Sequence, residues 1–390
     1  MIQVDQALSI IAENSCKMPI RKIKVTKSLG FILAEAIYSP MDMPSFRQSA
    51  MDGYAFTHSE LQQFNVVSTS KAGDFSNKMI KKDEAIRIFT GAYIPDNLDT
   101  VVMQEHTTVK NKTVEITKMP VRFTNVRNKG EQIKENELVL ENNTMVTPAA
   151  IGFLACLGIT EITVYAKPKV AIVVTGNELV KAGARLSEGK IYESNSIMLQ
   201  AALQGIGIKK VKTFKVKDNL KATKKALKYC LSAFDVVLVS GGISVGDYDF
   251  VKEALLSNGV EELFYKINQK PGKPLFFGKK GKTIVFALPG NPASTLTSFY
   301  IYVDPALKIS MGFETSLLPK ITRKITIPFE NTSGKTLFLK AFFDDEKVTV
   351  LESQSSAMLN TFATANGLIC LPFDQVNIEK NQEVPVIPIN

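Results

Sequence analysis

The stretch VVLVSGGISVGDYDF, residues 236–250, changes from an apolar run to a loop rich in Gly, Ser and Asp. A helical pattern follows over residues 249–257. Glycines and serines before a helix N-terminus can present backbone N–H groups to an anion. Asp247 and Asp249 offer the hard oxygen ligands that suit Mg²⁺ beside a phosphate. The stretch predicts a strand, a phosphate- or phosphate–metal-binding loop and a helix; the alternative for the loop is a tight structural turn capped by Asp.

On both sides of this stretch, short apolar runs alternate with helical patterns. This alternation of β-branched runs and helices is typical of a parallel sheet with helices on both faces. Residues 169–313 are therefore expected to form a three-layer α/β domain with a mainly parallel sheet. The runs cover residues 170–174, 211–216 and 283–288, and the helical patterns cover residues 196–205, 220–231 and 292–309.

Two further loops follow strands of this expected sheet, and open α/β sheets bind ligands at the carboxyl ends of their strands. Residues 175–179 read TGNEL, in which Glu178 could be a metal ligand, a base or an ordinary turn residue. Residues 289–294 read PGNPAS, in which Asn291 could cap a helix that has Pro292 at its first position. Taken alone, the second loop is better explained as a stiff turn.

Three lysines lie on a loop between these strands. Residues 266–274 read KINQKPGKP, and the Pro and Gly residues prevent a regular helix there. We expect Lys266, Lys270 and Lys273 to converge on an anion from this stiffened loop. The alternative is three exposed, solvated lysines.

The formal net charge of +9 is concentrated in the α/β segment. Residues 169–313 contain 21 Lys and Arg against 11 Asp and Glu, whereas the remaining residues contain 26 against 27. This asymmetry indicates an anionic ligand in that segment. The nine lysines between Lys209 and Lys228 are better explained as a solvated helix face and strand edge. The sequence has no RNA-binding signature or zinc-finger spacing, so nucleic acid is not an expected partner.

The rarer residue types exclude several other classes of protein. The four cysteines form no CxxC pair, which argues against a disulfide framework or a zinc site. His58 and His106 are the only histidines, so we expect chemistry based on carboxylates, lysines and backbone amides. The longest apolar stretch, residues 149–157, is shorter than the ~20 residues that span a bilayer. With no secretory leader at the N-terminus, a soluble cytoplasmic protein is expected.

The segments outside the α/β domain predict three more parts. Residues 45–132 contain short strands separated by Asn, Gly, Lys and Pro, which indicates a mostly-β module. We expect this module to be inserted into an extended N-terminal domain built from residues 1–44 and 133–168. In that domain Asp5 would cap one helix, and Thr147–Pro148 would begin another. Residues 314–390 alternate in the manner of strands and predict a small antiparallel β-barrel, with a short helix near residues 356–365.

Eight motifs occur in one order along the chain: SAMDGYA, TGAYIP, VVMQE, TGNEL, GKIYESNS, SGGISVGDYD, KPGKP and LPGNPAS. Together they resemble the molybdopterin molybdenumtransferase family, which includes the bacterial enzyme and the E domain of gephyrin. The resemblance implies insertion of molybdate into adenylylated molybdopterin with release of AMP. It also implies a Mg²⁺-dependent homodimer of four-domain subunits, whose cleft lies between the α/β domain of one subunit and the β module of the other. The adenylyltransferase of the same pathway and recipient molybdoenzymes are the further partners implied.

The resemblance also implies roles for individual residues. Asp52 and Thr90 would come from the partner subunit, and the lysines of residues 266–273 would face pyrophosphate and molybdate. The implied catalytic residues are Asp52, Thr90, Glu178, Asp218, Asp249, Lys266 and Lys270. The implied substrate-binding residues are Gly241, Gly242, Ser244, Gly246, Asp247, Lys273, Pro289, Gly290, Asn291, Pro292, Ser294, Lys340 and Ser356. The implied metal ligands are Glu178, Asp247 and Asp249.

Three positions depart from the family pattern. Asn177 replaces an Asp in the TGxEL loop, Gln132 replaces the last carboxylate of a GED motif, and Lys340 replaces an arginine near the molybdate site. A lysine at that position loses bidentate oxyanion binding. The change at Gln132 favours the main alternative, a non-catalytic molybdopterin carrier or scaffold. A phosphate-handling hydrolase on a similar α/β domain is the second alternative.

Overall fold

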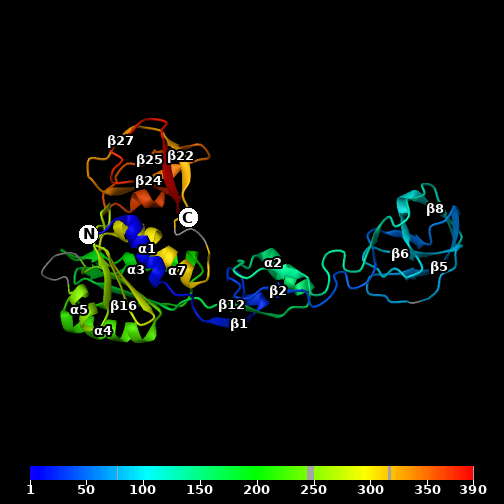
Figure 1. Ribbon diagram of the computed structural model, residues 1–390, viewed down its shortest axis with the longest axis horizontal. Helices are drawn as coiled ribbons and strands as arrows, with labels where there is room; N and C mark the ends of the chain where they lie inside the picture. Colours follow the sequence, from blue (N-terminus) through cyan, green and yellow to red (C-terminus); the bar gives the residue numbers. More distant parts are fainter. Residues whose placement is uncertain (77, 244–249, 315–317, 390) are drawn as a thin grey trace. The chain divides into compact units, whose positions relative to one another are not determined.

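The computed structural model describes residues 1–76, 78–243, 250–314 and 318–389. Contacts between Cα atoms divide the chain into two compact units, which are described separately below (Figure 1). One unit comprises Met1–Arg21, Gly30–Ala34 and Val164–Asn390, and the other comprises Lys22–Leu29 and Glu35–Thr163.

The first unit contains the expected α/β sheet, in the strand order β16-β13-β17-β21-β20-β18. The first four of these strands are parallel, which confirms the mainly parallel sheet. The last two strands of the order, β20 and β18, were not predicted from the sequence; β20 pairs antiparallel with β21, and the edge strand β18 pairs antiparallel with β20. The bounds are β13 Val170–Thr175, β16 Val211–Val216, β17 Val236–Ser240, β18 Glu261–Tyr265, β20 Phe276–Lys280 and β21 Thr283–Leu288.

Helices cover both faces of this sheet, as the apolar runs predicted. Every residue of β13 is buried, and its side chains alternate between two separate apolar cores. One core also receives side chains from α1, α3, α6 and α7, and the other receives them from α4 and α5 (Figure 1). The bounds are α1 Val4–Asn14, α3 Asn195–Gly205, α4 Leu220–Ala233, α5 Val251–Ser257, α6 Pro292–Ser298 and α7 Asp304–Ser310, with a π-helical segment, Phe299–Val303, between the last two.

Helix α1 begins differently from the sequence expectation. Gln3, not Asp5, occupies the N-cap position, and Asp5 lies in the first turn. The backbone N–H of Gln3 donates to Oε1 of Gln6 at 3.0 Å, so an amide side chain one turn into the helix satisfies a donor at its start.

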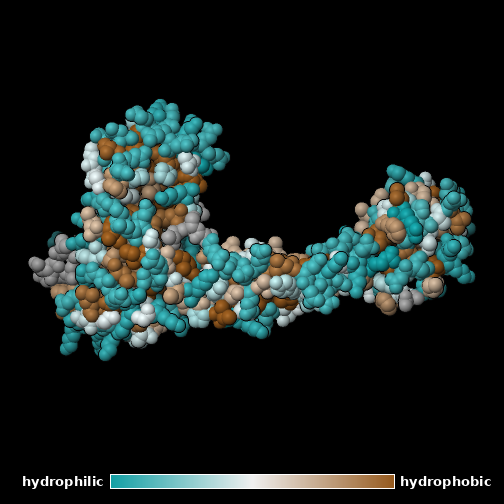
Figure 2. All heavy atoms as spheres, viewed as in Figure 1, coloured by the Kyte–Doolittle hydropathy of each residue, from teal (hydrophilic) through white to brown (hydrophobic). Residues whose placement is uncertain are grey.

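The C-terminal segment of the first unit closes into a five-stranded barrel, as predicted. Strands β24, β25, β22, β28 and β26 pair in that order, and β26 pairs again with β24. The barrel is not wholly antiparallel, because β22 and β25 run parallel. Figure 2 shows mainly hydrophilic side chains on the visible face of the barrel. The bounds are β22 Ile321–Ile325, β24 Thr336–Phe343, β25 Lys347–Val350, β26 Gly367–Leu371 and β28 Glu383–Pro388.

The second unit contains a six-stranded, mostly antiparallel sheet in the order β7-β4-β6-β5-β9-β8. Helix α2, Pro148–Cys156, begins after Thr147, whose Oγ1 accepts from the backbone N–H of Ala150 at 3.2 Å. The domain boundaries expected at residues 45 and 132 stay predictions. The bounds are β4 Gly53–Phe56, β5 Gln63–Ser70, β6 Glu84–Ile88, β7 Thr100–Met103, β8 Thr107–Lys110 and β9 Thr113–Ile116.

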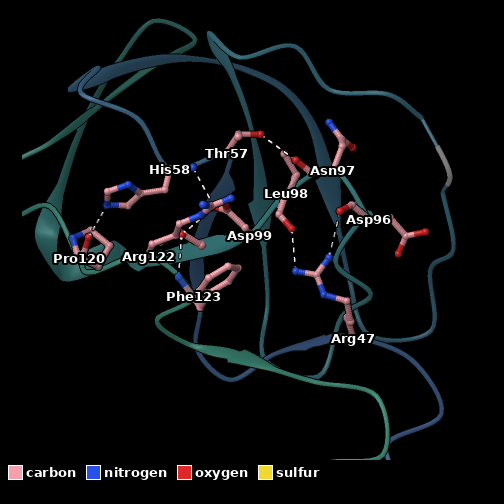
Figure 3. Close-up of polar contacts among 11 residues, drawn as sticks. Arg47, Thr57, His58, Asp96, Asn97, Leu98, Asp99, Pro120, Arg122 and Phe123 are labelled. Carbon is pink, nitrogen blue, oxygen red and sulfur yellow. Dashed lines mark hydrogen bonds and ion pairs between the residues drawn. The ribbon is translucent and has the colours of Figure 1, made fainter.

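A buried carboxylate organises one end of this sheet (Figure 3). Asp99 accepts from the backbone N–H of His58 at 2.8 Å and from Nε of Arg122 at 2.7 Å. The hydroxyl of Thr100 donates to the same carboxylate at 2.9 Å. Nε2 of His58 lies 3.0 Å from the carbonyl oxygen of Pro120. His58 therefore lies in a loop and takes part in local hydrogen bonds at this end of the sheet.

No helix within the described residues is long and apolar enough to cross a membrane.

Candidate active site

The first unit contains a cleft of about 1040 Å³ at the carboxyl ends of β13, β17 and β21. This is the edge at which a parallel α/β sheet binds its ligands. Residues 354–356 of the barrel segment also line the cleft. Of the residues predicted for the site, those that line it are Glu178, Asp218, Gly241, Gly242, Lys270, Lys273, Pro289, Gly290, Asn291, Pro292, Ser294 and Ser356.

The glycine loop after β17 approaches the floor of the cleft closely. Gly241 and Gly242 have φ angles of +92° and +64°. A Cβ atom on Gly241 would lie 2.9 Å from the backbone oxygen of Thr175, so only glycine fits there. However, the N–H of Gly241 donates to the carbonyl of Leu288 at 3.4 Å and is not a bare donor, contrary to the sequence prediction. Ser244, Gly246, Asp247 and Asp249 lie outside the described residues.

The loop after β21 leads into α6, with Asn291 at the N-cap position and Pro292 first in the helix. The side chain of Asn291 does not cap the helix as expected. Its Nδ2 donates to Oγ of Ser356 at 2.8 Å, and the backbone N–H of Ala293 donates to the carbonyl of Ser356 at 3.2 Å. Two hydrogen bonds therefore hold a serine of the barrel segment at the start of α6.

Two carboxylate residues line the cleft just after strands of the sheet: Glu178 follows β13, and Asp218 follows β16. Asp218 Oδ2 accepts from the backbone N–H of Asn177 at 2.7 Å, and the N–H of Asp218 donates to Oδ1 of Asn177 at 3.3 Å. The amide of Asn177 keeps this reciprocal pair without a second negative charge beside Asp218, which gives the departure at residue 177 a structural role. Glu178 is exposed and lines the same cleft.

A buried side chain holds the lysine loop, residues 266–274, through hydrogen bonds to its backbone. Gln269 is 1% exposed, and its Nε2 donates to the carbonyls of Pro271 at 3.0 Å and Gly272 at 3.2 Å. Its Oε1 accepts from the hydroxyl of Tyr302. Lys270 and Lys273 are exposed on this loop and line the cleft.

Lys266 does not join the other two lysines, contrary to the sequence prediction. It is absent from the described lining of the cleft, and its Nζ lies 4.8 Å from the ring centroid of Tyr265. Its φ angle of +67° turns the backbone at the end of β18. The predicted convergence of three lysines therefore reduces to Lys270 and Lys273.

Lys340 is also in a different place from the one predicted. It is 3% exposed, and its ammonium group donates to the carbonyls of Ser353, Ser355 and Met358 at 2.8, 3.4 and 2.9 Å. Burial lowers the pKa of this ammonium group. All three of its N–H groups are used within the barrel, so Lys340 holds the loop that carries Ser356 and does not line the described cleft.

Several cleft residues were not predicted from the sequence, although some of them, such as Tyr192 and Asn195, belong to the motif GKIYESNS. Asn195 is buried, and its Nδ2 donates to Oγ of Ser240 and to the carbonyl of Gly290, both at 2.8 Å. It thereby ties the loops after β17 and β21 together. The only signal in the sequence for such residues is a nearby turn or helix start. Asn195 follows a Glu-Ser pair at the start of α3, and Lys335 follows a Ser-Gly pair typical of a turn. The other unpredicted lining residues include Thr175, Tyr192, Lys335 and Gln354.

Asp52 and Thr90 belong to the second unit and form a local pair. The backbone N–H and the hydroxyl of Thr90 both donate to Oδ1 of Asp52 at 2.8 Å. The backbone hydrogen bond from Thr90, aided by its hydroxyl and by the charge of Arg87, holds the pKa of the Asp52 carboxyl below its usual value. Both of these hydrogen bonds go to Oδ1, and the described residues give Oδ2 of Asp52 no hydrogen bond.

Comparison with known proteins identifies the family. Three family models match successive segments: the MoeA N-terminal region (domain I and II) over residues 2–158, a probable molybdopterin binding domain over residues 171–309, and the MoeA C-terminal region (domain IV) over residues 322–389. A molybdopterin molybdenumtransferase of Haemophilus influenzae is 34% identical over 402 residues, covering 100% of this chain and 99% of that protein. The chain belongs to the molybdopterin molybdenumtransferase family.

Other relatives agree with this assignment. Molybdopterin molybdenumtransferase 2 of Mycobacterium tuberculosis is 32% identical over 406 residues, covering 99% of each chain. A molybdopterin biosynthesis MoeA protein of Pyrococcus horikosii has a solved structure with a TM-score of 0.84 and 27% identity, covering 100% of this chain and 99% of that one. Membership of the family makes this chain a transferase with a role in molybdenum cofactor biosynthesis.

Proposed function

We propose that the cleft binds adenylylated molybdopterin and molybdate, and that the enzyme inserts molybdate into the pterin dithiolene with release of AMP. The observation that carries this proposal is the cleft itself, where strand-end loops meet Lys270, Lys273 and Ser356. Backbone amides, ammonium groups and hydroxyls are the groups that bind phosphates and oxyanions. The names of the full-length relatives support the same substrates.

The chemistry that the protein must supply is positioning and charge neutralisation. Both substrates are polyanions, and bringing two like unit charges to 4 Å costs about 4 kcal/mol at an effective dielectric constant of 20. Lys270 and Lys273 offset this repulsion on a loop that Gln269 keeps in one conformation. The sulfur atoms that receive molybdenum belong to the pterin, so no nucleophilic side chain is required.

We also propose that Mg²⁺ binds at this cleft. Within the described residues no group of three His, Cys, Asp or Glu side chains forms a ready-made metal site. Mg²⁺ commonly needs only one or two carboxylates, with phosphate oxygens and water as its other ligands. Glu178 and Asp218 supply such carboxylates, and Asp247 and Asp249 of the loop after β17 would complete the set. The bound ion would polarise the pyrophosphate for cleavage.

A further part of the proposal is a homodimer, located in the cytoplasm, in which each cleft is completed by the β module of the partner. The Asp52–Thr90 pair supports it, because a surface carboxylate held in one orientation by two donors is prepared for a further ligand. The resemblance of SAMDGYA and TGAYIP to the family motifs gives these two residues the same role.

The experiment that tests the proposed function is AMP release. The chain is incubated with adenylylated molybdopterin and Mg²⁺, and AMP is measured before and after molybdate is added. We expect molybdate to increase AMP release at least tenfold, because cleavage is coupled to insertion. Tight binding of the pterin without AMP release would favour the carrier or scaffold instead. Cleavage of simple dinucleotides without any pterin would favour the phosphate-handling hydrolase.

A further inference from the structure

A lysine that the sequence analysis did not select lines the cleft from the barrel segment. Lys335 immediately precedes β24 and lies in the same lining as Lys270 and Lys273. It is half-buried, whereas the other two lysines are exposed. Among the described residues, its ammonium group has no ion pair or hydrogen bond, and only its backbone groups are bonded. A cation in a cleft without an internal partner is available to an anionic ligand.

The turn that carries Lys335 is unusually well fixed for a surface turn. Asn331 is 2% exposed, and its Nδ2 donates to the carbonyl of Lys335 at 3.0 Å. Oδ1 of Asn331 accepts from the N–H and the hydroxyl of Ser333, and that hydroxyl accepts from the N–H of Lys335 at 3.3 Å. The buried side chain of Asn331 thus holds the backbone of the turn that carries Lys335.

The same turn is joined directly to the lysine loop, residues 266–274, which is its neighbour in the lining of the cleft. Strand β19, Gln269–Lys270, pairs in parallel with the start of β24, placing Gln269 beside Thr336. Nδ2 of Asn268 donates to the carbonyl of Gly334 at 3.2 Å, and the N–H of Thr336 donates to the carbonyl of Asn268 at 3.1 Å. These hydrogen bonds fix the backbone of Lys335 relative to the backbone of Lys270, and both residues line the cleft.

The barrel has no other described cation in this position. Lys340, which the sequence suggested for the oxyanion, donates all its protons to backbone carbonyls. The described barrel residues that line the cleft are Lys335, Gln354, Ser355 and Ser356, and only the first of them is charged.

We propose that Lys335 binds the dianionic tetrahedral oxyanion that the enzyme consumes, and that it sets the affinity for that substrate. The proposal rests on the proposed function and names a third cation of its site, in addition to Lys270 and Lys273. A charge-assisted hydrogen bond from an ammonium group is about twice as strong as a neutral one. Lys335 therefore acts on the binding of the oxyanion rather than on the cleavage of the pterin anhydride.

The test measures AMP release at increasing molybdate concentrations with saturating adenylylated pterin. In Lys335→Ala we expect the KM for molybdate to rise about tenfold, with kcat changed less than about threefold. Lys335→Arg should recover most of the affinity, because it restores the charge. The matched control is Lys324→Ala, which removes an exposed lysine of β22 outside the cleft and should behave as wild type.

The proposal is overturned if Lys335→Ala keeps the wild-type KM, or if it lowers kcat alone. Should Lys335→Ala melt below the wild-type temperature, Lys335→Gln is judged by the same criteria, since it keeps the length of the side chain. Calorimetric titration with molybdate alone separates this proposal from the proposed function. If wild type releases no AMP but binds molybdate, the proposed function fails, and a weaker affinity in the variant still supports Lys335. Equal affinities, or no detectable binding by wild type, would overturn its role.

Discussion

At the scale of single residues, Lys340 does not have the oxyanion-binding position that the sequence suggested, and we propose Lys335, which the sequence did not single out, for that role. The family resemblance directs attention to Lys340, which stands in a strand with an apolar pattern. Its burial could not be foreseen, because its three carbonyl partners lie in a loop more than ten residues away in the chain. Sequence patterns report which residues are present, but not which polar groups will be satisfied internally.

Lys340→Ala should therefore reduce stability more than it reduces affinity for molybdate. Removing the buried ammonium group takes the donor from three part-buried carbonyls and leaves a space in the barrel, and we expect the free energy of unfolding to fall by about 2–4 kcal/mol. Urea unfolding measures this change. Because the chain has no Trp, the unfolding is followed by far-UV circular dichroism and not by tryptophan fluorescence. Lys324→Ala serves again as the exposed control and should change stability by less than about 0.5 kcal/mol. A variant as stable as wild type would contradict the structural role of Lys340.

At the scale of elements, the strands and helices around the cleft were the most predictable part of the molecule. The runs at 170–174 and 236–239 are buried on both faces, so composition alone reveals them. Strands β18 and β20 escaped prediction because their runs are short and mixed, and because β20 ends in the residues GKK. The loop geometry of the site was less predictable, since the side chain of Asn291 bonds Ser356 across the cleft instead of capping α6.

The β module gives a prediction about pH. Burial raises the pKa of Asp99, but hydrogen bonds from the N–H of His58, from Arg122 and from Thr100 outweigh it and bring the pKa below the usual 3.8 (Figure 3). A carboxyl whose pKa is lower in the folded than in the unfolded state stabilises the protein when the pH is above its pKa in the unfolded state. This stabilisation is lost as the pH falls through its pKa in the folded state.

Asp99→Asn should thus destabilise the module by about 1–3 kcal/mol at pH 7, because Arg122 loses its charged partner. The difference from wild type should shrink as the pH falls below about 4. Thermal unfolding at a series of pH values provides the measurement. Asp96→Asn, in the same loop but with an exposed carboxylate, is the control and should match wild type at every pH. A difference that is constant with pH would argue against the ionised state of Asp99.

At the scale of the whole molecule, the proposed function combines motifs that are about 200 residues apart into one site made from two subunits. Asp52 lies in the second unit and Asp249 in the first, and in the proposed dimer each cleft would take Asp249 from one subunit and Asp52 from its partner. Chain order alone could not assign them, because the partner of a surface carboxylate in another subunit leaves no local pattern.

Mixing inactive Asp52→Ala and Asp249→Ala subunits should restore part of the activity. If the cleft is shared, a hybrid dimer has one site that carries both substitutions and one that carries neither. Random exchange makes about half of the dimers hybrids, so about a quarter of all sites are intact and the sample should recover about a quarter of the wild-type activity. AMP release after demonstrated subunit exchange is the measurement. The control mixes each variant with itself, and recovery equal to that control would argue for a cleft formed within one subunit.

The most direct test of the central claim counts both products of a single turnover in one sample. Enzyme preloaded with adenylylated molybdopterin and Mg²⁺ receives molybdate, and both free AMP and pterin-bound molybdenum are quantified over time. We expect free AMP and pterin-bound molybdenum to appear together in a one-to-one ratio, and neither to accumulate when molybdate is omitted. AMP released without pterin-bound molybdenum, or pterin bound unchanged throughout, would contradict it.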